Sequence, residues 1–124
     1  MNVVDSSAWL SYLAGDKNAG KFSKSIEDLD SLLVPSITLT EVFKTIFRQR
    51  DEEVALAVIA HMKQGKVVPL DSELAINAAT YGMTHKLPLA DSIIYATARK
   101  FDATLWTQDM DFKALKKVRY YSKA

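Results

Sequence analysis

Four acidic residues stand at positions where carboxylates can act together. Two of them follow apolar runs of strand length, and two lie at the start of stretches whose apolar residues recur at helical spacing. In an α/β protein such positions share one edge of the sheet, where ligands bind. The residues are Asp5 and Asp109 after the apolar runs, and Glu41 and Asp91 at the helical stretches.

Carboxylates gathered at one edge of a sheet repel one another, and a bound divalent cation relieves that repulsion. Oxygen ligands of this kind suit the hard cation Mg²⁺, and Mn²⁺ is an alternative. The sequence therefore predicts a divalent metal site at the carboxyl edge of the sheet.

Two of these acids have structural explanations that compete with a metal site. Asp5 could cap the helix that follows it, but Ser6 and Ser7 could do so equally well, so the cap does not require Asp5. Thr38 and Glu41 match the capping-box pattern, and for Glu41 taken alone this structural role is favoured. Glu41 gains a functional interpretation only from the other acids.

The remaining acids also have structural alternatives. Asp91 stands in a first helical turn, where a carboxylate complements the helix dipole, but its apolar neighbours suggest that it is paired, metal-bound or facing a cleft. Asp109 and Asp111 could each cap a short helix over residues 112–115. Asp109 is favoured as the ligand because it is nearer to the strand. Asp71 also follows an apolar run, but a helix cap explains it fully.

Strands and helices are expected to alternate along the chain. Short apolar runs separated by helical stretches favour an α/β fold with a parallel sheet and helices on both faces, in a single domain over residues 1–124. Pro69 limits the third run to a short strand or one near an edge. The expected strands cover residues 2–4, 32–34, 67–70, 103–107 and 118–121.

Composition disfavours several other chemistries. The 124 residues are 48% hydrophobic, and the net charge of +1 means that any nucleic-acid binding must come from local patches. The absence of cysteine excludes disulfides and thiol catalysis. No pattern brings His61 and His85 together, so a paired-histidine site is disfavoured. With no recognisable signal peptide or membrane-spanning run, we expect a soluble, cytoplasmic protein without membrane contact.

Four segments carry a resemblance to a known family. They hold the four acids in a fixed order, and their order, spacing and strand or helix context make the set specific. Together they resemble the PIN-domain nucleases, and most of all the small VapC-type toxins of prokaryotic toxin–antitoxin pairs. The resemblance covers nearly the whole chain. The segments are Val4–Ser7, Thr40–Val42, Leu89–Ala98 and Leu105–Phe112.

The resemblance implies a PIN-like three-layer α/β/α fold with a five-stranded parallel sheet in the order 3-2-1-4-5. The first and fourth strands would then lie side by side where the winding reverses. Asp5 and Asp109 would face each other across the crevice at that point.

The resemblance also implies an activity, which is metal-dependent hydrolysis of RNA phosphodiester bonds with Mg²⁺ or Mn²⁺. Asp5, Asp91 and Asp109 would bind the metal directly or through water, and Glu41 would orient ligand waters or hold a second ion. Supporting polar residues and a basic cluster for the RNA substrate would complete the site. The supporting residues are Ser7, Thr107 and Asp111, and the basic residues are Lys113, Lys116 and Lys117.

Two protein partners follow from the same resemblance. Such toxins pair with themselves, so a homodimer is expected. They also bind a cognate antitoxin that blocks the acidic cleft, often with a basic side chain. The sequence by itself offers only apolar and aromatic residues that an ordinary core would also need.

Three other kinds of protein are alternatives to a nuclease. A phospho-acceptor signalling domain would share the fold and Mg²⁺, but it needs adjacent acids after an early strand, and Asp5 has no acidic neighbour. A non-catalytic RNA-binding module has no use for four clustered carboxylates. A structural interaction domain explains the core but leaves the acids without a role.

Overall fold

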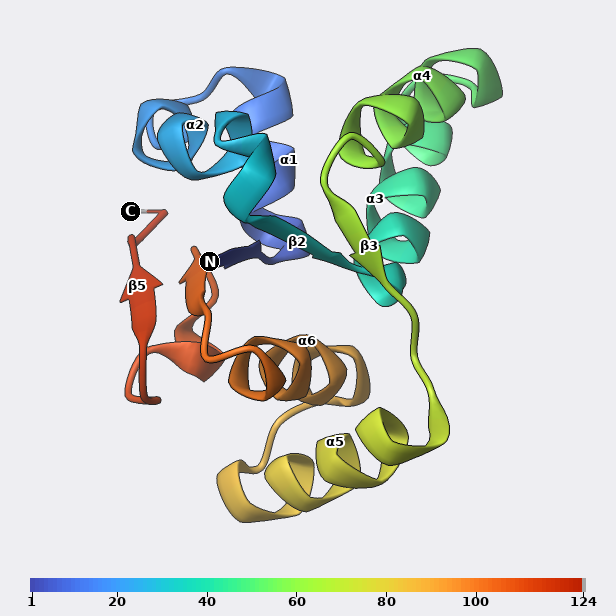
Figure 1. Cartoon of the computed structure of the whole chain (residues 1–124). Coiled ribbons are helices and arrows are strands. Elements are labelled where there is room, and N and C mark those ends of the chain that lie inside the picture. Colours follow the sequence, from blue (N-terminus) through green and yellow to red (C-terminus); the bar gives the residue numbers. More distant parts are fainter. Residues whose placement is uncertain (124) are drawn as a thin grey trace.

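The computed structural model describes residues 1–123, and its centre is a sheet of five parallel strands in the order β3-β2-β1-β4-β5. The first strand lies in the middle, and the winding reverses between it and β4. This is the predicted order (Figure 1). The strands are β1 (Asn2–Val4), β2 (Leu32–Pro35), β3 (Lys66–Val68), β4 (Thr104–Thr107) and β5 (Val118–Tyr120).

Six α-helices cover the two faces of the sheet and complete the predicted three layers. In Figure 1, α5 and α6 lie below the sheet, and α1, α2 and α4 lie above it. Two 3₁₀ turns, Leu29–Ser31 and Met110–Phe112, precede β2 and follow β4. The helices are α1 (Ser6–Ala14), α2 (Ala19–Glu27), α3 (Ser36–Gln49), α4 (Glu52–Met62), α5 (Ser72–His85) and α6 (Leu89–Lys100).

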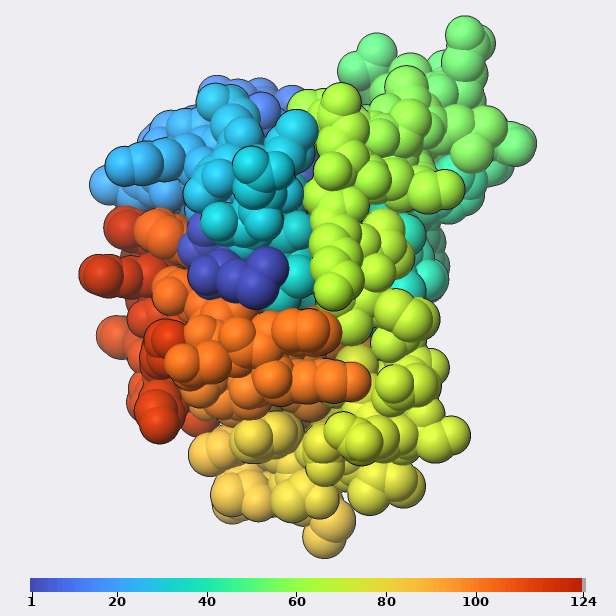
Figure 2. Space-filling view, in the orientation of Figure 1, coloured from blue at the N-terminus to red at the C-terminus, as the bar shows by residue number. Residues whose placement is uncertain are grey.

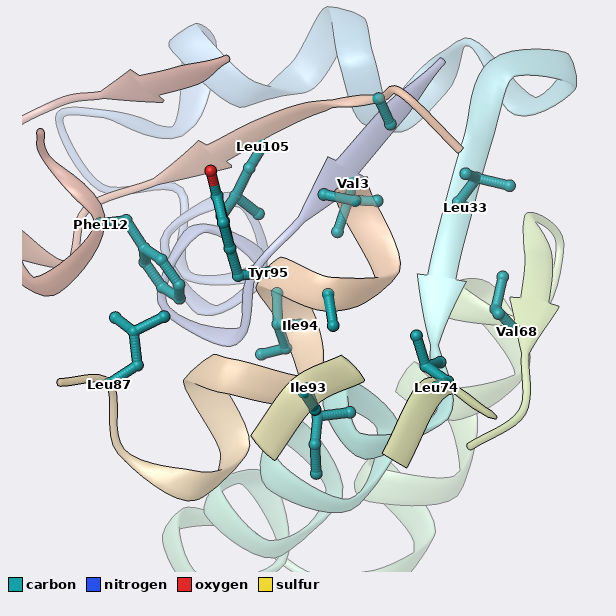
Figure 3. Close-up of a cluster of buried hydrophobic side chains, with 14 residues drawn as sticks. Val3, Leu33, Val68, Leu74, Leu87, Ile93, Ile94, Tyr95, Leu105 and Phe112 are labelled. Carbon is teal, nitrogen blue, oxygen red and sulfur yellow. The ribbon is translucent and has the colours of Figure 1, made fainter. Parts of the chain in front are cut away.

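The alternation of side chains along each strand divides the core into two clusters. Val3 points to the side of α5 and α6, where it joins Leu33 and Leu105 in one buried cluster (Figure 3). Val4, the next residue, belongs to the cluster formed with α1 to α4, where Trp9 is fully buried. Because successive strand residues face opposite sides, a strand of three residues can serve both clusters.

Two elements begin or end at other residues than the sequence predicts. The third strand stops at Val68, directly before Pro69, and it is an edge strand as that proline predicted. The prediction of a short helix over residues 112–115 is wrong, because the chain forms a 3₁₀ turn at Met110–Phe112 instead. Asp109 caps this turn by accepting the amide proton of Asp111 at 2.9 Å.

The capping box expected at Glu41 is also wrong. Helix α3 begins at Ser36, directly after Pro35 ends β2, so Glu41 lies in the second turn rather than at the start. The hydroxyl of Thr38 donates to the carbonyl of Pro35 instead of capping a later amide. Proline fixes its own φ in a range suited to a helix start, which moves the boundary toward it.

The space-filling view shows the first residues of the chain between the segments of β2 and β4, as expected for a central strand (Figure 2). Within residues 1–123, none of the helices has both the length and the apolar character that a bilayer crossing requires.

Candidate metal centre

The ends of β1 and β4 bring Asp5 and Asp109 to the same edge of the sheet. Val4 pairs with Trp106 in parallel register, and the amide of Asp5 donates to the carbonyl of Trp106 at 3.1 Å. Thr107, the last residue of β4, therefore lies beside Asp5, and Asp109 follows two residues later. This is the carboxyl edge of the sheet, where the sequence placed the site.

Asp5 is held by three hydrogen bonds in a nearly closed environment, with 2% of its surface exposed. Its Oδ1 accepts from the amide of Ala8 at 2.9 Å and from the hydroxyl of Ser7 at 2.8 Å. Its Oδ2 accepts from the hydroxyl of Thr107 at 2.6 Å. The expectation that Ser6 or Ser7 would serve as the cap is corrected here, because Asp5 is the N-cap of α1.

Thr107 connects two of the acids. Its hydroxyl donates to Asp5, and the same oxygen accepts the amide proton of Asp109 at 2.8 Å. The side chain is fully buried. Thr107 therefore fixes the carboxylate of Asp5 and the backbone of Asp109 together.

Asp109 also belongs to a group of three carboxylates beside Asp5. Asp91 in the first turn of α6, together with Asp109 and Asp111 around the 3₁₀ turn, each offer an oxygen within 4.8 Å of the others. Asp91 and Asp109 are half-buried and Asp111 is exposed. The structure thus brings together two of the three predicted ligands, with Asp111 beside them. Asp5 and Glu41 lie outside this tight group.

The charges of the four other acids act on Asp91. Its pKa is raised to about 7, first by burial and then by the charges of Asp109, Asp5, Asp111 and Glu41, in that order. The raised pKa of Asp91 thus reflects its burial together with the negative charge of its neighbours.

Asp5 is perturbed in the same direction. Burial raises its pKa to about 6 although the hydrogen bonds from Thr107, Ala8 and Ser7 oppose the shift, and the charge of Asp109 adds to it. Within residues 1–123, no lysine or arginine forms an ion pair with any of the five acids.

Glu41 approaches the site from α3. Its Oε1 accepts a 2.6 Å hydrogen bond from the hydroxyl of Ser6 in the first turn of α1. Position 41 is therefore tied to the segment that begins at Asp5, although the two residues are far apart in the sequence. The charge of Glu41 is the last of those that raise the pKa of Asp91.

A groove with a volume of about 890 Å³ adjoins the acidic residues between α1 and the α3–α4 pair. Ser6, Ser7, Glu41 and Gln108 line it, but Asp91 and Asp109 do not. The rest of its lining combines apolar side chains of three helices with uncharged polar, acidic and basic side chains, and Asp16 is the acidic one. The apolar residues include Leu10, Leu13, Ile46, Val54 and Val58, and the basic ones are Lys17, Arg50 and Lys123.

The three lysines expected to bind the substrate are divided between two edges of the sheet. Lys113 follows the 3₁₀ turn, and its ammonium lies 5.6 Å from the ring centre of Tyr120. Tyr120 pairs with Thr107 at the carboxyl edge. Lys113 therefore lies on the same edge as the acids.

Lys116 and Lys117 precede β5 and lie at the amino edge instead. The carbonyl of Lys117 accepts from the amide of Leu105, near the start of β4. Its ammonium binds the carbonyl of Asp102 at 2.8 Å and the Asp102 carboxylate at 3.2 Å. Asp102 comes before β4, so the sheet separates this ion pair from the acidic group.

A buried amide pair beside the site was not anticipated from the sequence. Gln108, between Thr107 and Asp109, contacts Ser7, and its side-chain oxygen accepts from Asn18 at 2.7 Å. The only available signal was the position of Gln108 between two candidate site residues. Asn18, in the loop before α2, carried no signal.

Comparison with known proteins gives a consistent result. The family model of the PIN domain matches residues 3–118. Among curated proteins there is no significant match.

Solved structures share the fold at low identity. A toxin–antitoxin complex from Klebsiella pneumoniae contains a chain with a TM-score of 0.82 and 19% identity, covering 98% of this chain and 99% of that chain. VapC20 of Mycobacterium tuberculosis, described as a toxin that cleaves the sarcin-ricin loop, has a TM-score of 0.78 and 22% identity, with coverages of 95% and 97%. A chain of DNA-bound VapBC from Salmonella typhimurium has a TM-score of 0.73 and 16% identity, covering 98% of this chain and 96% of that chain.

Proposed function

The chain belongs to the PIN domain family, and on this premise we propose that it is a metal-dependent endoribonuclease, working as a single domain. The observation that carries the proposal is the group of acids around Asp91, where burial first and then the charges of the neighbouring carboxylates raise its pKa to about 7. A protein that needed these carboxylates only for structure would gain by pairing them with basic side chains. An unpaired group is instead ready for a cation.

The donor set fits Mg²⁺ or Mn²⁺. Three carboxylates offer oxygens within 4.8 Å of one another, and oxygen is the donor that these hard cations prefer. We propose Asp91 and Asp109 as ligands together with Asp5, whose Oδ2 accepts only one hydrogen bond within the described residues. Asp111, the most exposed of the group, would support them. A bound divalent cation supplies charge that screens the phosphate and activates water.

The residues of the chain then have separate tasks. Thr107 and Ser7 hold the carboxylate of Asp5 in one orientation, and the amide of Asp111 holds that of Asp109. Ser6 holds Glu41 at the rim of the groove, where its carboxylate can orient water.

RNA is the substrate that the comparisons favour, since the structurally similar VapC20 is described as cleaving the sarcin-ricin loop. Lys113 is the proposed contact to the RNA backbone, because it alone of the three candidate lysines lies on the edge that carries the acids. The proposed place of action is the cytoplasm, where RNA is present.

The proposed biological role is that of the toxin in a type II toxin–antitoxin pair. Several structures of this fold are complexes of that kind. The groove beside Glu41 has an apolar lining suited to an amphipathic segment of the antitoxin. A basic side chain of that segment would pair with the acids and inhibit the enzyme.

We also propose a homodimer, as expected from the family resemblance. Phe47 and Leu56, on α3 and α4, are about half exposed and are available for such a contact. Light scattering at micromolar concentration tests this part, and a monomer contradicts it.

RNA cleavage by the purified protein tests the function directly. Structured RNAs would be incubated with Mg²⁺, with Mn²⁺, with EDTA, and with the folded Asp91→Asn variant. We expect cleavage only with metal and only with the unmodified protein. Binding of RNA without cleavage under every metal condition would favour a non-catalytic RNA-binding module.

A further inference from the structure

We propose that Gln108 is a positioning residue for the metal centre, and that Asn18 makes this positioning depend on the C-terminal segment. The inference rests on the proposed function. It concerns how the carboxylate of Asp5 is aimed, and it involves two buried amides that do not themselves belong to the acidic group.

Gln108 holds Ser7 at two points. Its backbone amide donates to the hydroxyl oxygen of Ser7 at 3.1 Å, and its side-chain Nε2 donates to the carbonyl of Ser7 at 3.1 Å. A hydroxyl has one proton to donate. The Ser7 oxygen accepts the amide proton of Gln108, so the hydroxyl proton of Ser7 points to another acceptor. That acceptor is Oδ1 of Asp5, which lies 2.8 Å from the Ser7 oxygen.

Asn18 fixes the orientation of the Gln108 amide. Its Nδ2 donates to Oε1 of Gln108 at 2.7 Å and to the carbonyl of Ser122 at 2.9 Å. Turning the Gln108 amide over would place two N–H donors opposite each other and would remove the bond to Ser7. The arrangement therefore has one satisfied orientation.

The C-terminal segment is anchored beside the same strand end. The amide of Tyr121 donates to the carbonyl of Thr107 at 2.9 Å, and its ring stacks on Trp106 with an interplanar angle of 10°. These contacts hold Ser122 at Asn18. A chain of hydrogen bonds thus runs from Ser122 through the two amides to Ser7 and Asp5.

Both amides are nearly inaccessible, with Gln108 7% and Asn18 4% exposed. Burying an amide is costly unless its hydrogen bonds are made, and apolar side chains would fill the same space without that cost. Two polar side chains at these positions are explained because their hydrogen bonds orient Ser7 and Asp5. Residues that orient metal ligands typically change metal affinity by about 10- to 100-fold when they are replaced.

The test compares Gln108→Met, which has similar volume and no amide, with the matched control Thr97→Val. Thr97 is fully buried in α6, and its hydroxyl donates to the carbonyl of Ile93 at 2.8 Å, so its loss removes a buried hydrogen bond that involves none of the residues in this chain of hydrogen bonds. The measurements are Mn²⁺ affinity by calorimetry, kcat and KM for RNA cleavage, and amide exchange at Ala8 and Asp109 in metal-free protein.

We expect Gln108→Met to weaken Mn²⁺ binding by about tenfold, to lower kcat more than it changes KM, and to speed exchange at Ala8. Asn18→Ala should give a smaller change in the same direction. Thr97→Val should lower the melting temperature and leave these quantities unchanged. If Gln108→Met does not fold, Gln108→Glu replaces it, because it keeps the oxygen facing Asn18 and loses the donor to Ser7.

Wild-type Mn²⁺ affinity and wild-type exchange at Ala8 in the folded Gln108 variant would overturn the inference. That outcome differs from a failure of the proposed function, in which the unmodified protein would neither bind Mn²⁺ nor cleave RNA. In that second case the exchange rates of metal-free protein still decide whether Gln108 positions Ser7 and Asp5.

Discussion

The hydroxyl of Thr107 donates a 2.6 Å hydrogen bond to Oδ2 of Asp5, and it joins the ends of two neighbouring strands where the winding of the sheet reverses. The same oxygen accepts the amide proton of Asp109. One buried hydroxyl therefore sets the relative position of two acids that lie about 100 residues apart in the sequence.

Replacing Thr107 with valine keeps the shape and removes this hydroxyl. We expect Thr107→Val to lower the free energy of unfolding by about 1–3 kcal/mol, because Asp5 and the Asp109 amide each lose a partner in a buried place. Mn²⁺ affinity should fall as well. Thr107→Ser should retain most of the stability and most of the Mn²⁺ affinity, and calorimetry measures both quantities.

Thr97→Val is the matched control for this prediction. Thr97 is equally buried, but its hydroxyl donates to the carbonyl of Ile93 within α6, at 2.8 Å. Its loss should affect stability without affecting Mn²⁺ affinity. Equal losses of affinity in the two valine variants would contradict the role assigned to Thr107.

The stability of the metal-free protein should depend on pH through Asp91 and Asp5. Their pKa values rise from 3.8 in the unfolded reference to about 7 and about 6 in the fold. The folded state thus binds protons more tightly, so the stabilisation is complete below about pH 4 and is lost as pH rises through about 6 to 7. The melting temperature should therefore fall between pH 5 and pH 8.

Thermal unfolding in EDTA over this range measures the effect. Below pH 5, Asp16 and Asp102 act in the opposite sense, because hydrogen bonds to them lower their pKa values. A melting temperature that is constant or rises from pH 5 to pH 8 is incompatible with the electrostatics described.

Neutralising Asp91 should stabilise the metal-free protein. At pH 8 the Asp91→Asn variant has the same shape and lacks a carboxylate that faces four other acids. We expect its melting temperature in EDTA to exceed that of the unmodified protein. Asp71→Asn is the control, because Asp71 caps α5 with a 2.8 Å bond to the amide of Leu74 and asparagine caps equally well. A lower melting temperature for Asp91→Asn would count against repulsion at the site.

RNA affinity should respond to Lys113 and not to Lys117. Lys113 lies at the acidic edge, whereas Lys117 is held by Asp102 at the other edge. Lys113→Ala should weaken binding and reduce the salt slope of the affinity by about 1. Lys117→Ala should leave both unchanged. Fluorescence anisotropy at several salt concentrations measures the RNA affinity of each variant. Weaker binding by Lys117→Ala and unchanged binding by Lys113→Ala would exclude the proposed RNA contact.

Much of the fold follows from local pattern. The apolar runs predict all five strands and their parallel arrangement, and Pro69 predicts the edge position of β3. The order of the strands came from the family resemblance. The place of Asp91 in the first turn of a helix also follows from local pattern, whereas its role as a ligand stays a prediction.

Other parts depend on contacts that no local pattern contains. Ser6 and Ser7 looked like adequate caps, yet Ser6 binds Glu41 and Ser7 binds Asp5, which leaves the cap to Asp5. The lysines after Asp109 are near one another in the sequence, but the start of β5 carries Lys117 to the opposite edge. Only the register between strands decides such placements.

The central claim is that the clustered carboxylates bind a divalent cation, and calorimetric titration of the purified protein with Mn²⁺ at pH 8 tests it most directly. We predict saturable binding that is lost in Asp91→Asn. When the titration is repeated at pH 6 to 7, where Asp91 and Asp5 retain protons, binding should also release protons. The Asp71→Asn variant should bind as the unmodified protein does. No saturable heat with the unmodified protein, or unchanged binding in Asp91→Asn, would contradict the account.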